Sequence, residues 1–308
     1  MVAFAGGPDD LVIYHYSTGW PLALDLLRRC RGLRMVKYHN ITPPEFFQRY
    51  SGDYRTACEN GRKELEKVAA LGFEMYLGDS SYNLEELIAA GAPRERSRVL
   101  APFHRVQEIV EAEADVALID ALTDGARNFL MVGRVAPNKG HLHLVEAFSA
   151  YVRAYAEPAR LILLGKVDPR LHAYTEAIRQ RIDAHGLGEH VLWIDGASEA
   201  QLKAAYLASH VFMLMSEHEG FCVPLVEAMA LGTPIVAHAS SAIPETLGDA
   251  GIAWQEQDPW LYAASAARLF TDDDLRSGLL ERGRRRYRQS FSNDVLRQRF
   301  VELLEPVL

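Results

Sequence analysis

The chain has 308 residues, of which 49% are apolar and 24% charged, and its net charge is −8. This is ordinary globular composition for one large domain or two medium ones, and the acidic balance argues against a general nucleic-acid binder. Cys30, Cys58 and Cys222 form no CxxC pair, which indicates a reduced protein without structural zinc. No run approaches the ~20 apolar residues of a membrane span. The N-terminus does not resemble a secretory signal, so we expect a cytoplasmic protein.

Short apolar runs alternate with segments of helical period along the chain, which is typical of parallel α/β architecture. The first set comprises expected strands at 11–16, 34–39 and 73–77 and expected helices at 21–31, 59–71 and 80–90, and it ends at 99–103. About three strands, against ~5–6 in a typical sheet, predict a shortened first domain over residues 1–103. Residues 104–123, rich in Glu, Ala and Asp, are expected to form a surface linker.

A second alternating set follows the expected linker. It comprises expected strands at 128–132, 160–164, 191–194, 211–215 and 234–237, and expected helices at 141–155, 172–185, 199–209, 224–231, 260–270 and 273–289. Fully apolar strands suit a sheet that helices cover on both faces. The sequence therefore predicts two doubly wound domains, the second over residues 124–290, followed by an amphipathic terminal helix at 291–308.

Two glutamates, Glu219 and Glu227, flank the turn Gly-Phe-Cys-Val-Pro after the expected strand at 211–215. Pro224 suits the first turn of a helix, so Glu219 is expected on the preceding loop and Glu227 about one turn into the helix. Ligands of open parallel sheets bind at the carboxyl ends of strands, and the N–H groups at such a helix start attract anions. This arrangement suits a ligand with phosphate and sugar groups. The residues alone also allow solvated charges at a helix start.

A second loop of the same kind favours the ligand interpretation. Met-Val-Gly133-Arg134-Val-Ala-Pro-Asn-Lys139-Gly140 also follows an apolar strand and precedes a helix. Gly133 permits a tight turn, and the fork of Arg134 with the point charge of Lys139 suits a diphosphate. If both strands are parallel, the two loops lie at the same edge of one sheet.

These two segments together resemble the donor domain of the retaining GT-B glycosyltransferases of family 4, also called glycosyl transferases group 1. The resemblance rests on Gly133-Arg134, Lys139-Gly140 and the E-x7-E spacing of Glu219 and Glu227, and it covers roughly residues 126–300. It extends more weakly over residues 9–103 through Tyr38-His39-Asn40 and Gly78-Asp-Ser-Ser-Tyr82. The family implies a GT-B fold of two Rossmann-like domains facing a cleft, with the terminal helix packed back on the first domain.

The resemblance also implies roles for individual residues. Arg134 and Lys139 would hold the donor diphosphate, and Glu227 would accept hydrogen bonds from the ribose. Glu219 would lie at the reaction centre, and His39 would reach the donor sugar from the first domain. The remaining donor-binding positions would be Gly133, Gly220, Phe221, Cys222 and Val223. Many relatives have glycine at position 222, and we attach no redox meaning to the cysteine.

We expect no metal and no cofactor, since fixed cations can stabilise a diphosphate leaving group. The acidic pairs that could hold a metal, Asp9-Asp10 and Asp272-Asp273-Asp274, do not follow a buried strand with a matching partner. The arginine-rich runs 28–31 and 282–288 could contact an anionic membrane surface, although a solvated helix face is the simpler explanation. Peripheral contact with the inner membrane face therefore stays open.

The expected function is transfer of a hexose from GDP-mannose or a UDP-hexose to a glycan or lipid-linked saccharide, as in polysaccharide biosynthesis, with retention of configuration. One alternative is a non-catalytic nucleotide-sugar binding subunit or fragment, which the short first domain motivates. Another is a different GT-B enzyme such as a sugar-nucleotide epimerase. A nicotinamide oxidoreductase is disfavoured because no strand leads into G-x-G-x-x-G.

Overall fold

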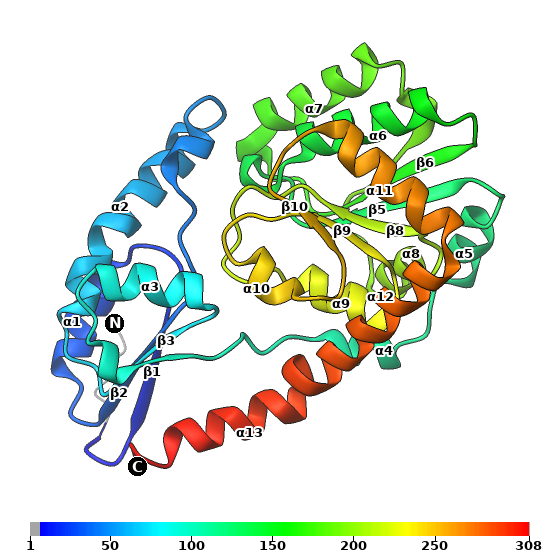
Figure 1. Cartoon of the computed structure of the whole chain (residues 1–308). Helices are drawn as coiled ribbons and strands as arrows, with labels where there is room; N and C mark the ends of the chain where they lie inside the picture. Colours follow the sequence, from blue (N-terminus) through cyan, green and yellow to red (C-terminus); the bar gives the residue numbers. More distant parts are fainter. Residues whose placement is uncertain (1–6, 308) are drawn as a thin grey trace. The chain divides into compact units, whose positions relative to one another are not determined.

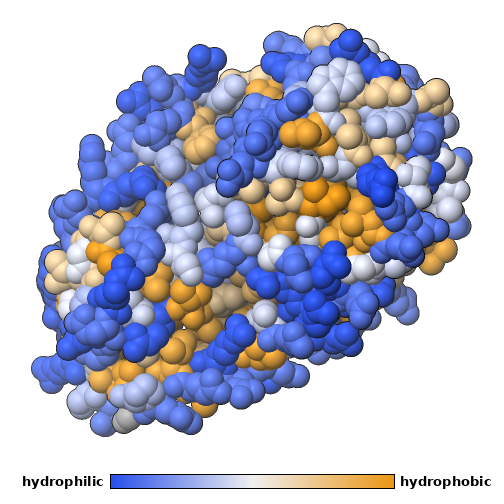
Figure 2. Space-filling view, in the orientation of Figure 1, coloured by the Kyte–Doolittle hydropathy of each residue, from blue (hydrophilic) through white to orange (hydrophobic). Residues whose placement is uncertain are grey.

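The chain folds into two compact units, each built on one parallel sheet (Figure 1). The computed structural model describes residues 7–307. Unit 1 takes the described residues of Met1–Phe103, Glu219–Phe221 and Asn293–Leu308, and unit 2 takes His104–His218 and Cys222–Ser292. The surface of the face seen in Figure 2 mixes hydrophilic areas with smaller hydrophobic ones, as the composition predicts.

Unit 1 contains a four-stranded sheet in the order β1-β2-β3-β4, with every neighbouring pair parallel. The strands are β1 (Leu11–Tyr16), β2 (Leu33–Tyr38), β3 (Met75–Gly78) and β4 (Ser97–Val99). The helices are α1 (Pro21–Arg29), η1 (Pro44–Phe47), α2 (Gly52–Ala69), α3 (Ser81–Ala89), η2 (Arg94–Arg96) and α13 (Asn293–Leu304).

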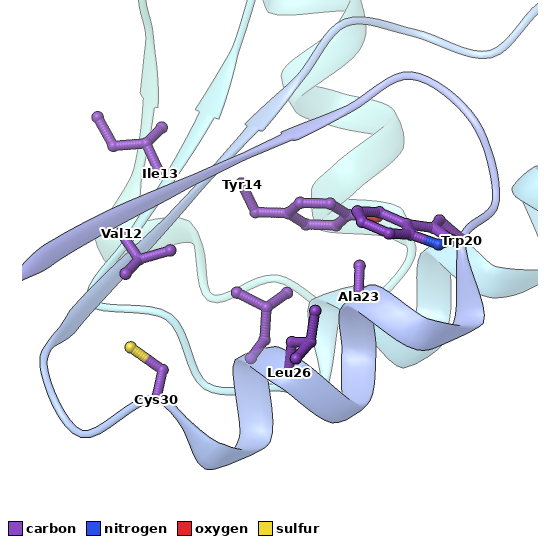
Figure 3. Close-up of a pocket in the computed structure, with 8 residues that line it drawn as sticks. Val12, Ile13, Tyr14, Trp20, Ala23, Leu26 and Cys30 are labelled. Carbon is purple, nitrogen blue, oxygen red and sulfur yellow. The ribbon is translucent and has the colours of Figure 1, made fainter. Parts of the chain in front are cut away.

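The two faces of this sheet bury different helices. Side chains alternate along a strand, and Figure 3 shows Val12 and Ile13 pointing to opposite sides of β1. The face with Val12 packs in one apolar cluster with residues of α1, α2 and α3. The face with Ile13 packs against α13 through Phe300, Leu303 and Leu304. The terminal helix thus completes the core of unit 1.

Unit 2 contains a six-stranded sheet in the order β10-β9-β8-β5-β6-β7, again parallel throughout. The strands are β5 (Arg127–Val132), β6 (Ala159–Leu164), β7 (Val191–Ile194), β8 (Val211–Leu214), β9 (Ile235–His238) and β10 (Ile252–Trp254). The helices are α4 (Val106–Glu111), α5 (Val116–Leu122), η3 (Pro137–Lys139), α6 (His141–Ala154), η4 (Pro169–Leu171), α7 (His172–Ala184), η5 (Gly188–His190), α8 (Glu199–Leu207), α9 (Val223–Leu231), α10 (Ile243–Leu247), α11 (Pro259–Thr271), α12 (Asp273–Arg286) and η6 (Tyr287–Phe291). Figure 1 shows α6, α7 and α11 on one face of the sheet and α8, α9 and α12 on the other.

The direction of winding reverses between β5 and β8. From β5 the chain proceeds outward through β6 to β7, and it then returns to form β8 on the other side of β5. In open α/β sheets the crevice outside the carboxyl ends of two such strands is the usual ligand site. The loops after β5 and β8 are the two that carry Arg134 and Glu219.

Several elements differ from the sequence-based expectation. Residues 104–123, expected as a surface linker, carry α4 and α5 in unit 2, because Val106, Ile109 and Leu122 are buried there. Helix α2 begins at Gly52 rather than near residue 59, since the Ser51 side chain accepts a hydrogen bond from the N–H of Tyr54 and caps it. Strands β4 and β10 are only three residues long, too short for a clear alternating pattern.

His141 is buried at the start of α6. Its ring lies edge-on to Tyr174, with the ring centroids 6.0 Å apart, and its backbone N–H donates to the Tyr174 hydroxyl. Burial, reinforced by the positive charge of Lys139, lowers the pKa of His141 to about 3. The ring is therefore neutral at physiological pH.

Acidification should destabilise unit 2 through His141. Its folded-state pKa lies below the unfolded value, so its contribution to stability is complete above about pH 6.5 and decreases as pH falls toward 3. We expect the wild type to lose about 2 kcal/mol of unfolding free energy through this group between pH 6.5 and pH 5. Urea denaturation followed by tryptophan fluorescence at both pH values measures this loss.

The matched variants are His141→Phe, which cannot titrate, and His172→Phe, which removes an exposed histidine. His141→Phe should show the smaller pH dependence, whatever its absolute stability, while His172→Phe should follow the wild type. An equal slope for wild type and His141→Phe would contradict the assignment.

Candidate active site

Asn138 joins the loop after β5 to the loop after β8. Its backbone carbonyl accepts hydrogen bonds from the N–H groups of Glu217 and His218, at 2.9 and 3.3 Å. Its side-chain amide donates to the His218 carbonyl at 3.0 Å. The two loops that the sequence singled out therefore meet at one edge of the unit 2 sheet, as parallel strands require.

Two glycines allow the backbone in this region to approach very closely. A Cβ on Gly140 would lie 1.8 Å from the carbonyl oxygen of Met215, and Gly140 has a φ of +67°. A Cβ on Gly165 would lie 1.8 Å from the carbonyl oxygen of Gly133. Neither position accepts a side chain without moving the backbone. The loop after β5 is thus held between the ends of β8 and β6.

Arg134 and Lys139 lie on this constrained loop. The neighbours of Arg134 are both anchored to the end of β6, since Gly133 N–H donates to Leu164 O at 3.0 Å and Val135 N–H donates to Lys166 O at 3.1 Å. Lys139 ends η3 directly before Gly140. Both cations therefore project from a backbone whose position is set by neighbouring strands.

Helix α9 begins with a left-handed residue. Cys222, its N-cap, has a φ of +77°, a conformation that favours glycine. The Leu225 N–H donates to the Cys222 carbonyl, and Pro224 has no N–H. The predicted cradle of backbone donors therefore extends no further into the helix than Val223.

Glu227 lies on α9 with only 8% of its surface exposed. Its Oε2 lies 2.7 Å from the hydroxyl oxygen of Tyr206, which donates the hydrogen bond. Burial raises the pKa of Glu227, and the Tyr206 hydrogen bond offsets part of that rise. A carboxylate held in this way can gain stability by accepting further hydrogen bonds from ligand hydroxyls.

The interpretation of the two glutamates as solvated helix-start charges is wrong. Glu219 is 6% exposed, so it is as buried as Glu227. Burial of a carboxylate costs free energy unless polar partners compensate it, and surface helix starts carry no such cost. The geometry thus favours the ligand-binding interpretation of both residues.

Three buried polar atoms of these loops lack a hydrogen-bond partner within residues 7–307. They are Asn138 Oδ1, His141 Nδ1 and Ser216 Oγ. Buried polar atoms are normally satisfied, by protein or by ordered water. Their clustering on the loops after β5 and β8 fits a site that receives further polar groups.

His39 belongs to unit 1, where it follows β2 directly. Its Nδ1 lies 2.8 Å from Oδ2 of Asp79, and its Nε2 lies 2.7 Å from Nδ1 of His15. Asp79 also forms an ion pair with the buried Lys37, with 2.8 Å between Oδ1 and Nζ. A role was predicted only for His39, and Asp79 was noted only within the segment Gly78-Asp-Ser-Ser-Tyr82. The positions of His15 and Asp79 at strand ends were the signal that could have found them.

Asp272, in the acidic run considered as a metal ligand, caps a helix. Asp272 caps α12 by accepting from the Leu275 N–H at 2.9 Å, and it pairs with Arg268 at 2.6 Å. Within the described part of the chain, no group of three or more His, Cys, Asp or Glu side chains is arranged to hold a metal ion. Arg134 and Lys139 are two positively charged residues of the loop after β5.

The arginine-rich end of α12 serves the packing of unit 2. Arg282 donates to the Asp249 carbonyl at 2.8 Å, and Arg286 donates to the Thr246 carbonyl at 2.8 Å. Arg286 also lies over the Phe291 ring, 5.4 Å from its centroid.

No helix among residues 7–307 is long and apolar enough to cross a membrane.

Comparison with known proteins shows which family the chain resembles. The model of the family described as Glycosyl transferases group 1 matches residues 120–286. D-inositol 3-phosphate glycosyltransferase from Corynebacterium efficiens is 29% identical, over 90% of this chain and 69% of its own length. GDP-mannose:cellobiosyl-diphosphopolyprenol alpha-mannosyltransferase from Xanthomonas oryzae is 27% identical, over 74% of this chain and 61% of its own length.

Solved structures show the same fold. HepE from Anabaena, solved with UDP and glucose, superposes with a TM-score of 0.79 at 18% identity, over 96% of this chain and 78% of its own. Sucrose-phosphate synthase from Thermosynechococcus elongatus superposes with a TM-score of 0.78 at 19% identity, over 96% and 73%. With two Rossmann-like domains of the GT-B type and a family match over more than half its length, the chain belongs to the glycosyl transferases group 1 family.

Proposed function

We propose that this chain is a retaining glycosyltransferase that moves a hexose from a nucleotide-diphosphate sugar to a glycan or lipid-linked saccharide, without a metal. The observation that carries the proposal is the pair of loops joined by Asn138. One loop brings two cations, Arg134 and Lys139, and the other leads through Glu219 into the N-terminus of α9. Cations suit a diphosphate, and buried carboxylates suit sugar hydroxyls.

The chemistry follows from these charges. The bond from the sugar C1 to the diphosphate oxygen breaks, and the new bond to the acceptor oxygen forms on the same face of the sugar. The acceptor proton passes to the departing diphosphate. Arg134, Lys139 and the N-terminus of α9 would stabilise the negative charge that develops on the leaving group. Fixed cations can do what a metal does in other transferases, so no metal is required.

The relatives support a choice between two donor classes. The Xanthomonas relative uses GDP-mannose by its name, and the Anabaena structure contains UDP and glucose. We therefore propose GDP-mannose or a UDP-hexose as the donor. Glu227 would accept hydrogen bonds from the ribose, which both donor classes share, so its role does not depend on the base.

Calorimetric titration of the purified chain with GDP, UDP and ADP in the presence of EDTA tests the proposal. We expect one of the first two to bind, because the site supplies its own cations. Turnover of the matching nucleotide sugar, followed as release of the nucleoside diphosphate, should also persist in EDTA. Loss of binding in EDTA that Mg²⁺ restores would contradict metal independence, and binding without turnover on any acceptor would favour a binding subunit.

The two glutamates should separate binding from turnover. Glu227→Gln should weaken nucleoside diphosphate binding by about 10- to 100-fold, since a hydrogen bond to a charged group contributes roughly 1.5–3 kcal/mol. Glu219→Gln should lower turnover but leave the affinity for the nucleoside diphosphate nearly unchanged, because Glu219 is assigned to the transferred sugar, which the nucleoside diphosphate lacks. Titration calorimetry and initial rates measure the two effects. Equal losses of affinity in both variants would contradict this division of roles.

Glu227→Gln should also raise the stability of the unliganded chain. The raised pKa of Glu227 means that its charged form opposes folding, a cost that is absent below the unfolded pKa near 4.3 and grows as pH rises above it. The melting temperature of Glu227→Gln should therefore exceed that of the wild type at pH 8 by more than at pH 5. The exposed Glu281→Gln serves as the matched control and should change neither property.

A further inference from the structure

Four polar side chains form a continuous chain at the strand ends of unit 1. His15 and Lys37 are register partners on β1 and β2, while His39 and Asp79 directly follow β2 and β3. Backbone hydrogen bonds continue past the strand ends, from His39 N–H to Tyr16 O at 2.9 Å and from Asp79 N–H to Tyr38 O at 3.3 Å. The pairing of the strands therefore places these side chains so that Lys37 contacts Asp79, Asp79 contacts His39, and His39 contacts His15.

The contacts favour one set of proton positions on the two imidazoles. The ammonium of Lys37 pairs with one oxygen of Asp79, so that carboxylate is an acceptor only. The other oxygen then requires a proton on Nδ1 of His39, 2.8 Å away. Nε2 of a neutral His39 is left as an acceptor, and the atom 2.7 Å from it, Nδ1 of His15, must donate. The remaining nitrogen of His15, Nε2, carries a lone pair.

The surroundings support a neutral His15. Burial lowers its pKa, and the neighbouring His39 and Lys37 lower it further. The planes of the two rings are 9° apart and their centroids 5.0 Å apart, which suits a hydrogen bond in the plane of both rings. Both histidines also line a pocket of about 350 Å³, whose other walls include Leu77, Leu100 and Phe300. A small ligand group in this pocket can therefore reach His15.

We propose that Asp79 and Lys37 are a positioning pair that fixes the tautomers of His39 and His15, so that Nε2 of His15 accepts a hydrogen bond from a ligand hydroxyl. The two acid–base partners act through His39 and do not themselves need to touch the ligand. This inference relies on the proposed function only for the source of the hydroxyl, which a sugar would supply. The tautomers themselves are a property of the unliganded chain.

Asp79→Asn should move the proton of each histidine from Nδ1 to Nε2. The Lys37 ammonium would attract the new amide oxygen, and the amide NH₂ would then face Nδ1 of His39. That nitrogen would have to accept, which moves the proton of His39 to Nε2. Nδ1 of His15 would accept from it in turn, and Nε2 of His15 would become a donor. One substitution at Asp79 should therefore invert two histidines.

Long-range ¹H–¹⁵N spectra of the chain labelled at its 11 histidines measure this directly. His15→Gln and His39→Gln assign the two signals. In the wild type we expect both rings in the Nδ1–H form, with Nε2 at the shift of an unprotonated nitrogen. In Asp79→Asn both should change to the Nε2–H form, while the exposed Asp294→Asn in the same unit should leave both signals unchanged.

Wild-type spectra with either ring in the Nε2–H form would overturn the proposal, and so would an Asp79→Asn spectrum identical to wild type. If Asp79→Asn does not fold, the wild-type spectrum alone decides. The result is independent of turnover, so a failure of this inference is distinguishable from a failure of the proposed glycosyl transfer.

Discussion

The hydrogen bonds of Asn138 are the interaction on which the proposed site of unit 2 depends. They join the carboxyl ends of β5 and β8, the two strands between which the winding of the sheet reverses. Without them the loop with Arg134 and Lys139 and the loop before α9 would be independent surface segments. With them, two cations and a helix start face the same edge of one rigid sheet. The close approaches at Gly133 and Gly140 restrict the same loop further.

The site is built at a cost in stability. Glu227 is a carboxylate whose pKa is raised by burial, and Cys222 adopts a left-handed conformation that suits glycine. Both the buried carboxylate and the left-handed residue lower the stability of the unliganded fold. Such costs concentrate at functional sites, where stability is exchanged for a preorganised arrangement. The surrounding apolar sheet compensates them.

Sequence reasoning predicted the elements with strong local signals. Strands such as β5 and β6 are continuous apolar runs, and the Arg134 loop and E-x7-E motif have fixed spacing. It did not predict the burial of Glu227, because Tyr206 lies 21 residues away and only the packing of α8 on α9 brings them together. It missed the contacts of His39 with His15 and Asp79 for the same reason: register between strands, not local sequence, places them. The helices α4 and α5 were missed because, at six and seven residues, each is too short to show a clear helical period.

Amide hydrogen exchange, measured with and without the nucleoside diphosphate that binds, tests the central claim most directly. The account predicts that residues 133–140 and 216–223 gain protection together on addition of UDP or GDP, because one diphosphate contacts both loops. The acidic turn at Asp272, between α11 and α12, should show no change. Protection of one loop without the other, or of neither while the nucleotide is bound, would contradict the account.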